Sequence, residues 1–169
     1  LRPNSRTLIK FLGHSEKVNS VSLSSDGKLA LTGANDKHAI LWNPTTGQPI
    51  HKWQFDNRVM KVLLNTSGTQ AFICDSTNNA LIMNNNSGKQ ISKLDIKRRK
   101  MNFSAARFSN DDTQLMTGTP AREIILWQVK TGEKLAKWQA QRSKHAQIKG
   151  GVVYSVANKG INQIISISS

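Results

Sequence analysis

Several features are scarce in this chain, and each scarcity excludes a class of protein. Of 169 residues only Cys74 is a cysteine, so there is no intrachain disulfide framework and the redox compartment stays open. No apolar run approaches the roughly 20 residues that span a bilayer, so we expect no transmembrane segment. The first residues, Leu1-Arg2-Pro3-Asn4-Ser5, contain neither the apolar stretch of a secretory signal nor an initiator Met. We therefore expect the chain to be part of a longer protein.

Acidic residues are scarce as well. The chain has 10 Asp and Glu against 24 Lys and Arg, a formal net charge of +14. Its four histidines lack the spacing of a zinc site, and the paired carboxylates of Asp111-Asp112 lie in a segment typical of a turn. Gly150-Gly151 lacks the rest of a nucleotide-binding fingerprint. The sequence predicts no metal site, no cofactor and no catalytic residues.

What the chain does contain is an internal repeat. Trp53, Leu94 and Trp138 each close a run of alternating apolar residues, at the roughly 40–45 residue period of a four-stranded propeller blade. Two series of turn residues recur in phase with them. They are Asp26-Gly27, Ser67-Gly68, Asp111-Asp112 and Lys159-Gly160, and then Thr46-Gly47, Ser87-Gly88 and Thr131-Gly132. Three series in one phase indicate a β-propeller.

Each period divides into short alternating strands between turn residues, without a helical period. The predicted fold class is all-β, a β-propeller segment of about four blades, each a four-stranded antiparallel sheet. The expected blades are residues 13–53, 54–94 and 95–138, with an incomplete blade at 139–169 and the outer strand of a preceding blade at 8–12. The predicted strands are Val18–Leu23, Leu29–Thr32, Ala39–Trp42, Ile50–Trp53, Val59–Leu64, Ala71–Cys74, Ala80–Met83, Gln90–Leu94, Asn102–Phe108, Gln114–Thr117, Ile124–Trp127, Lys134–Trp138, Val152–Val156 and Ile164–Ser168.

The first copy of the repeat carries the motifs of a known family. Together they resemble the WD-repeat pattern of β-propellers, and they are Leu12-Gly13-His14, Val18–Val21, Ser25-Asp26-Gly27, Leu31-Thr32-Gly33, Asp36 and Leu41-Trp42. Within that family, the stretch from Phe11 to Tyr154 also resembles the C-terminal half of WD-repeat lipoproteins from Gram-negative bacteria. The second resemblance implies the periplasmic side of the bacterial cell envelope, rather than the cytoplasm, as the compartment.

The WD-repeat resemblance also assigns a role to four polar residues of the first copy, namely His14, Thr32, Asp36 and Trp42. In other proteins a histidine, a hydroxyl and a carboxylate form a nucleophilic triad. In WD repeats these residue types form a buried hydrogen-bond network that fixes one blade, and we favour this structural interpretation. The second copy has lost the set. The third keeps Thr117 and Trp127 but has Ala121 where the Asp would fall.

The predicted blades do not make a closed ring. The fourth copy lacks its two outer strands, and the strand at 8–12 lacks the rest of its blade. Propellers protect their strand edges by closing the ring, so we expect a parent of about seven blades. The ring would be completed by missing blades or by another chain.

The predicted loops distribute the positive charge unevenly between the two faces of the propeller. The loops from the fourth strand to the next first strand, and from the second to the third, open on one face, which receives eleven basic and six acidic residues. The opposite face receives five and four. Two segments dominate the first face, residues 96–101 and the long loop 139–150. The residues predicted to bind a partner are Lys17, Arg58, Lys97, Arg98, Arg99, Lys100, Arg122, Arg142, Lys144 and Lys149.

We interpret the chain as a non-enzymatic protein-interaction scaffold that presents this basic face to a partner with an acidic surface. The alternative is an electrostatic tether to a polyanion or to an anionic membrane surface, with peripheral membrane contact. A solvated run of charge without a partner is a third interpretation. Nucleic acid is disfavoured, because the loops lack interleaved aromatic residues for base stacking. Lys52, Lys93 and Lys137 recur in the fourth strands, where they are interpreted first as charges that block edge-to-edge pairing.

Overall fold

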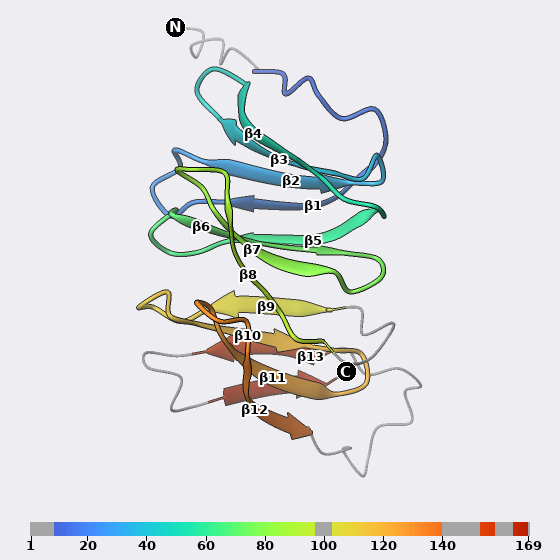
Figure 1. Cartoon of the computed structure of the whole chain (residues 1–169), viewed down its shortest axis with the longest axis vertical. Helices are drawn as coiled ribbons and strands as arrows, with labels where there is room; N and C mark the ends of the chain where they lie inside the picture. Colours follow the sequence, from blue (N-terminus) through green and yellow to red (C-terminus); the bar gives the residue numbers. More distant parts are fainter. Residues whose placement is uncertain (1–8, 97–102, 140–152, 158–163, 169) are drawn as a thin grey trace, which may run out of the picture.

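The computed structural model describes residues 9–96 and 103–139, together with the backbone of two further strands at 153–157 and 164–168. In this part of the chain every regular element is a β-strand. Three four-stranded antiparallel sheets and one strand pair succeed each other along the chain and are stacked in Figure 1. We call the three sheets blade 1 (β1–β4), blade 2 (β5–β8) and blade 3 (β9–β12). The predicted all-β fold with four-stranded antiparallel blades is confirmed.

Within each blade the strands pair in the order in which they occur in the chain. Blade 1 contains β1 (Val18–Leu23), β2 (Ala30–Ala34), β3 (His38–Asn43) and β4 (Gln48–Gln54). Blade 2 contains β5 (Val59–Leu64), β6 (Gln70–Asp75), β7 (Ala80–Asn84) and β8 (Gln90–Lys93). Blade 3 contains β9 (Ala105–Phe108), β10 (Gln114–Gly118), β11 (Glu123–Gln128) and β12 (Lys134–Gln139), and the last pair is β13 (Val153–Ala157) with β14 (Ile164–Ser168).

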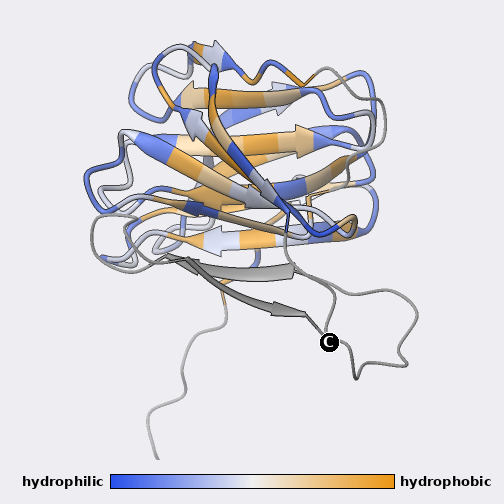
Figure 2. Ribbon diagram, turned by 90° about the horizontal axis from the view of Figure 1, so that it is seen from below, coloured by the Kyte–Doolittle hydropathy of each residue, from blue (hydrophilic) through white to orange (hydrophobic). Residues whose placement is uncertain are grey.

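Neighbouring blades pack face to face through apolar side chains. Strand β6 explains how, because successive side chains of a strand point to opposite faces of its sheet. Ala71 and Ile73 belong to the core shared with blade 1, whereas Phe72 and Cys74 belong to the core shared with blade 3. A sheet buried on both faces needs a continuous apolar run rather than an alternating one. Figure 2 shows hydrophobic residues along the strands and hydrophilic ones mainly in the turns at both ends.

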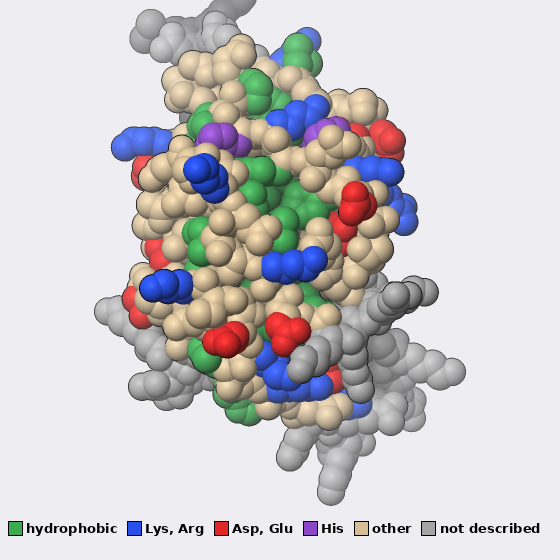
Figure 3. All heavy atoms as spheres, in the orientation of Figure 1, with side chains coloured by type: hydrophobic (Ala, Val, Ile, Leu, Met, Phe, Trp, Pro, Cys, Tyr) green, Lys and Arg blue, Asp and Glu red, His purple; other side chains and the backbone are tan. Residues whose placement is uncertain are grey.

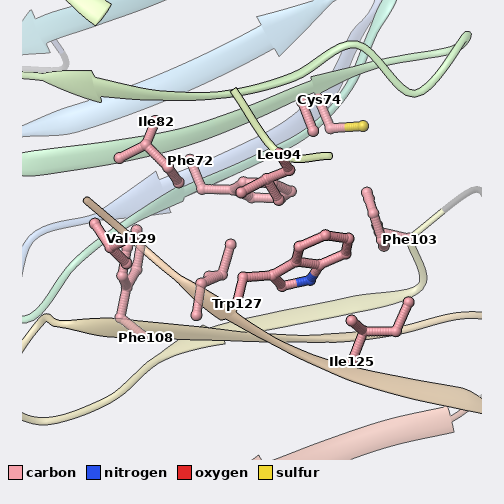
Figure 4. Packing of buried hydrophobic residues seen from close by; sticks show 11 residues of the cluster. Phe72, Cys74, Ile82, Leu94, Phe103, Phe108, Ile125, Trp127 and Val129 are labelled. Atoms are coloured by element: carbon pink, nitrogen blue, oxygen red, sulfur yellow. The ribbon is translucent and has the colours of Figure 1, made fainter. Parts of the chain in front are cut away.

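Blades 2 and 3 share the larger described core, which is built around one tryptophan. The indole of Trp127 is 1% exposed and lies near Phe72 and Leu94 of blade 2 and Phe103 at the start of blade 3 (Figure 4). Phe72 and Phe103 meet edge to face, with ring centroids 5.9 Å apart. Because these contacts join residues far apart in sequence, the blades stabilise each other rather than folding as separate sheets.

Polar contacts between the innermost strands join blades 1 and 2. The backbone N–H of Val62 donates to Ser20 Oγ at 3.1 Å, and that of Leu64 donates to Ser22 Oγ at 2.9 Å. The two serines alternate along β1 with Val21 and Leu23, which face away from blade 2. Hydroxyl groups therefore satisfy backbone donors at the edge of β5, where the next strand of a continuous sheet would otherwise be needed.

Residues 9–12, the described part of the outer strand predicted at 8–12, have no neighbouring strand among the described residues, so the prediction stays open. A strand needs a neighbouring backbone for its hydrogen bonds, and the described residues provide none beside this segment. The segment nevertheless packs as an outer strand would, since Lys10 lies against the turn at Gly47. The same contact repeats between the described blades, in the pairs His51 with Gly88 and Lys93 with Gly132.

The described sheets do not close into a ring, and one face of blade 1 remains open. On β1, Val21 is 61% and Leu23 64% exposed, and Leu12 ahead of the strand is 78% exposed. Their equivalents inside the stack, Val62 and Leu64, are buried. The part of the chain that the structure describes contains no helix long and apolar enough to cross a membrane.

Candidate partner-binding face and the network behind it

A chain of hydrogen bonds links the four polar residues singled out in the first repeat. Trp42 Nε1 donates to Thr32 Oγ1 at 2.8 Å, and Thr32 Oγ1 lies 2.7 Å from His14 Nε2. The other ring nitrogen of His14, Nδ1, lies 2.8 Å from Asp36 Oδ2. With the imidazole proton on Nδ1, each group donates to the next, from Trp42 through Thr32 and His14 to Asp36. The structure thus brings all four side chains together inside one blade.

Asp36 is the acceptor at the end of this chain, and its side chain is only 5% exposed. Burial alone would raise the pKa of Asp36 above 3.8. Hydrogen bonds from the His14 side chain and from the backbone N–H groups of His38 and Ser15 outweigh burial and lower the pKa. The carboxylate therefore holds the loop before β1 against the turn before β3.

We expect Asp36→Ala to lower the free energy of unfolding by about 1–3 kcal/mol, because it leaves buried donors without an acceptor. The pKa of Asp36 is lower in the folded state, so its contribution to stability is present above pH 3.8 and is lost as the pH falls through the folded-state pKa. Urea unfolding at pH 7 and pH 3 should therefore show a smaller pH dependence for Asp36→Asn than for the wild type. Asp56→Ala, in an exposed loop, is the control for Asp36→Ala. Equal losses of unfolding free energy in these two variants would contradict the network.

The other two blades keep less of this arrangement. In blade 3, Trp127 Nε1 donates to Thr117 Oγ1 at 2.8 Å, which repeats one link of the network. In blade 2 a different residue, Asp75, which no sequence motif singled out, is 2% exposed. Its Oδ1 accepts hydrogen bonds from the backbone N–H groups of Thr77 and Asn79 and from the Thr77 hydroxyl. Asp75 thus fixes the turn through hydrogen bonds inside that turn. The sequence feature that could have indicated this role is an Asp at the start of the turn with a Thr two residues later.

Four basic side chains on the loop face lie within the described residues, and they occupy two repeated positions. Lys17 and Arg58 each precede the innermost strand of a blade, and their carbonyls accept hydrogen bonds from the N–H groups of Asn35 and Ser76, both at 2.9 Å. Lys37 and Arg122 each lie at the tip of the turn between the second and third strands. The remaining predicted residues, Lys97, Arg98, Arg99, Lys100, Arg142, Lys144 and Lys149, lie outside the described part of the chain.

The two turn-tip cations have an unusual backbone conformation. Lys37 has φ of 67° and Arg122 has φ of 63°, in the left-handed region. An L-residue other than Gly or Asn costs roughly 1–2 kcal/mol there. The equivalent residue of blade 2, Asn78, is one that tolerates this region. Two long cationic side chains are therefore held at the tips of these turns at a cost to stability.

Several acidic residues of the same face are turned inward. Asp36 and Asp75 are engaged as described, and Glu123, which is 7% exposed, lies with its Oε1 2.5 Å from Lys137 Nζ. Lys17, Lys37 and Arg58 by contrast are exposed, and Arg122 is half-buried. The charge that this face presents to solvent is therefore more positive than its residue count indicates. Figure 3 shows the molecule from the side, in the orientation of Figure 1 and not onto the loop face, and there the Lys and Arg side chains form separate spots with hydrophobic side chains between them.

Two side chains of types that can act in catalysis, His14 and Cys74, are both engaged or buried. Both ring nitrogens of His14 are hydrogen-bonded within the blade, so the imidazole cannot serve as a general base toward an outside substrate without breaking the network. Cys74 is 3% exposed, and burial raises the pKa of its thiol to about 12, which keeps it protonated. Within residues 9–96 and 103–139 there is no group of three His, Cys, Asp or Glu that could hold a metal ion.

Comparisons with known proteins agree with this architecture. Residues 5–43 match the family model described as WD domain, G-beta repeat. The chain is 28% identical over 141 residues to pre-mRNA-processing factor 19 homolog 2 of Arabidopsis thaliana, covering 81% of this chain and 27% of the relative. It is 35% identical over 63 residues to the ribosome biogenesis protein BOP1 homolog of Arabidopsis thaliana, covering 37% of this chain and 8% of the relative. The chain thus spans about a quarter or less of the length of these relatives.

A solved structure has the same fold at low sequence identity. The crystal structure of the computationally designed Ika4 protein superposes with a TM-score of 0.70 and 14% identity, covering 97% of this chain and 98% of that chain. The family-model match and the curated relatives support a WD-repeat family, and the solved structure shows the shared fold alone. The narrower resemblance to bacterial lipoproteins, and the compartment that it implies, stay predictions.

Proposed function

We propose that this chain is a non-enzymatic protein-interaction scaffold, part of a larger WD-repeat propeller, whose basic loop face binds a protein partner with an acidic surface. The observation that carries the proposal is the repeated placement of Lys17 with Arg58 and of Lys37 with Arg122. Cations recur at equivalent positions of different blades, so they form one surface rather than a scatter.

The backbone strain at the two cationic turn tips supports a role of these residues in binding. A glycine or asparagine would satisfy the left-handed backbone at Lys37 and Arg122 without strain, as Asn78 does in blade 2. Backbone strain that brings no local stabilisation is typical of functional sites. The hydrogen bonds to the carbonyls of Lys17 and Arg58 fix the backbone of these residues before a partner arrives, so that binding has to order only their side chains.

The partner that fits such a face is a protein with clustered carboxylates. Association would be accelerated by the positive potential and weakened by salt, since the exposed charges are screened beyond about 8–10 Å at physiological ionic strength. The open face of blade 1, with Val21 and Leu23 exposed, supports completion of the ring by further blades. In that arrangement the loop face would continue across the added blades.

The proposal predicts a face-specific loss of binding. Poly-L-glutamate serves as the acidic probe, and its affinity for the chain is measured by fluorescence anisotropy at several salt concentrations. The triple variant Lys17→Glu, Arg58→Glu, Arg122→Glu is expected to bind at least about tenfold more weakly, because it replaces attraction by repulsion at the contact surface.

The matched control reverses three cations at the opposite end of the blades, Lys28, Lys89 and Lys130, and so has the same net charge. Its affinity is expected to change less than about threefold. Equal weakening by both variants would show that only net charge matters and would overturn the proposed face. Anionic phosphatidylglycerol vesicles and duplex DNA are further arms, and tighter binding to either would favour the tether over the protein scaffold.

A further inference from the structure

An exposed methionine lies at the loop-face end of the innermost strand of blade 2. Met60 is 44% exposed, whereas the two other methionines within the described residues, Met83 and Met116, are buried. Met60 is the extra residue of a β-bulge, because the pairing of β5 with β6 passes over it between Val59 and Lys61. A bulge turns a side chain out of the regular alternation of its strand, and bulges are frequent beside functional sites.

A second bulge residue, in blade 1, lies against this methionine. Asn19 is the extra residue of the bulge in β1. Its Nδ2 donates to Asn35 Oδ1 at 2.8 Å and to the backbone carbonyl of Val59 at 2.9 Å, and it lies 3.9 Å from Met60 Sδ. The two hydrogen bonds use both protons of the amide and fix its position. The Met60 thioether therefore lies against a fixed group at the junction of two blades.

Two cations of the basic loop face flank this contact. Lys17 precedes Asn19 by two residues, Arg58 precedes Met60 by two residues, and both cations are exposed. The backbone carbonyls of both cations accept hydrogen bonds from neighbouring turns. The contact between Asn19 and Met60 therefore places an apolar side chain between two positive charges, on strands whose relative position the blades fix.

A surface of this composition suits an aromatic side chain set among carboxylates. The sulfur of a thioether makes favourable contacts with aromatic rings, and the unbranched methionine side chain adapts to the shape of what it contacts. An acidic segment without a ring would satisfy Lys17 and Arg58 but would leave Met60 in water.

We propose that the loop face recognises its acidic partner through an aromatic residue that has carboxylates on both sides. The ring packs on the Met60 thioether, and the flanking carboxylates pair with Lys17 and Arg58. This inference rests on the proposed function, because it names the kind of acidic segment that the same face selects. Charge attracts many acidic segments to the face, whereas the contact with the ring discriminates among them.

The test uses the full 169-residue chain and two labelled peptides, Gly-Glu-Glu-Phe-Glu-Glu-Gly and the same peptide with Ser in place of Phe. Fluorescence anisotropy is expected to show about fivefold tighter binding of the Phe peptide to the wild-type chain. The triple variant of the loop face is expected to bind both peptides at least about tenfold more weakly. Equal affinity of the wild-type chain for both peptides would overturn the aromatic preference, and the basic face would still stand if the triple variant weakened both. Binding of neither peptide would overturn both proposals.

Variants locate the contact with the ring. Met60→Ser is expected to reduce the preference for the Phe peptide to less than about twofold and to leave the affinity for the Ser peptide unchanged. Leu135→Ser is the matched control, because Leu135 is 49% exposed on the outer strand β12, and it should keep the full preference. A preference that survives in a folded Met60→Ser would place the ring elsewhere, for example on Val21 and Leu23, and would overturn the proposal. If circular dichroism shows that Met60→Ser does not fold, Met60→Gln replaces it under the same criterion.

Discussion

Replacing Gly132 with alanine is expected to lower the free energy of unfolding by about 2–4 kcal/mol. Gly132 has φ of +76°, which is unfavourable for alanine by itself. A Cβ at this position would lie 2.1 Å from the carbonyl oxygen of Lys93, which belongs to the outer strand of blade 2. Backbone cannot move aside as a side chain does, so the two blades would have to separate.

Gly27→Ala is the matched control for this prediction. Gly27 also has a positive φ, of 70°, but no atom lies within 4 Å of the Cβ that alanine would add. Its substitution should therefore cost only the conformational term, about 1–2 kcal/mol. Urea unfolding followed by far-UV circular dichroism measures both variants. Equal losses would show that blade 3 does not rest on the outer strand of blade 2 in the way described.

Trp127→Ala is expected to lower the free energy of unfolding by about 3–5 kcal/mol, the usual cost of removing a large buried aromatic side chain. The indole fills the core between blades 2 and 3 and donates to Thr117 Oγ1 at 2.8 Å. Small domains are stable by only about 5–15 kcal/mol, so this loss alone would bring the chain close to unfolding. Both blades should be affected together, because the cluster belongs to both.

Trp138→Ala is the comparison, since Trp138 lies on the outer strand β12 and is 40% exposed. Its loss should cost less than about 1 kcal/mol. If Trp127→Ala does not fold, Trp127→Phe keeps an aromatic ring and removes the hydrogen bond, at an expected cost of about 1–2 kcal/mol. A Trp127→Ala variant as stable as Trp138→Ala would contradict the shared core.

The strands and the first-repeat network could be predicted from the sequence because their signals are local and repeated. Alternation set the strands at Val18–Leu23 and Val59–Leu64 with the bounds that the structure gives. The network rested on four residue types at spacings that resemble the WD repeat, and the structure joins His14, Thr32, Asp36 and Trp42 by hydrogen bonds. In both cases all the residues that make up the pattern lie within one repeat.

Contacts between blades could not be predicted, because they join residues whose spacing follows no local rule. Asp112 was expected to act within its own turn, as Asp111 does, but it bonds the backbone of the neighbouring blade. The serine contacts from β1 to β5 gave no sequence signal, because serines also occur on solvent-facing strands.

The loop face illustrates how charge and geometry contribute differently. The sequence gives the number of cations, whereas the structure shows that Asp36, Asp75 and Glu123 turn away from solvent and that Lys37 and Arg122 extend from strained turn tips. Net charge governs long-range attraction, but the arrangement of exposed charges selects the partner. A binding surface of this kind depends on blades that are held rigidly relative to each other, which links the stability predictions to the proposed function.

The central claim is that the basic loop face, and not the net charge of the chain, makes the contact with an acidic partner. Backbone amide NMR spectra of the chain titrated with poly-L-glutamate test it most directly. The account predicts chemical-shift changes at Lys17, Lys37, Arg58 and Arg122, with little change at Lys28, Lys89 and Lys130. Equal changes at both ends of the blades, or changes confined to the second set, would contradict it.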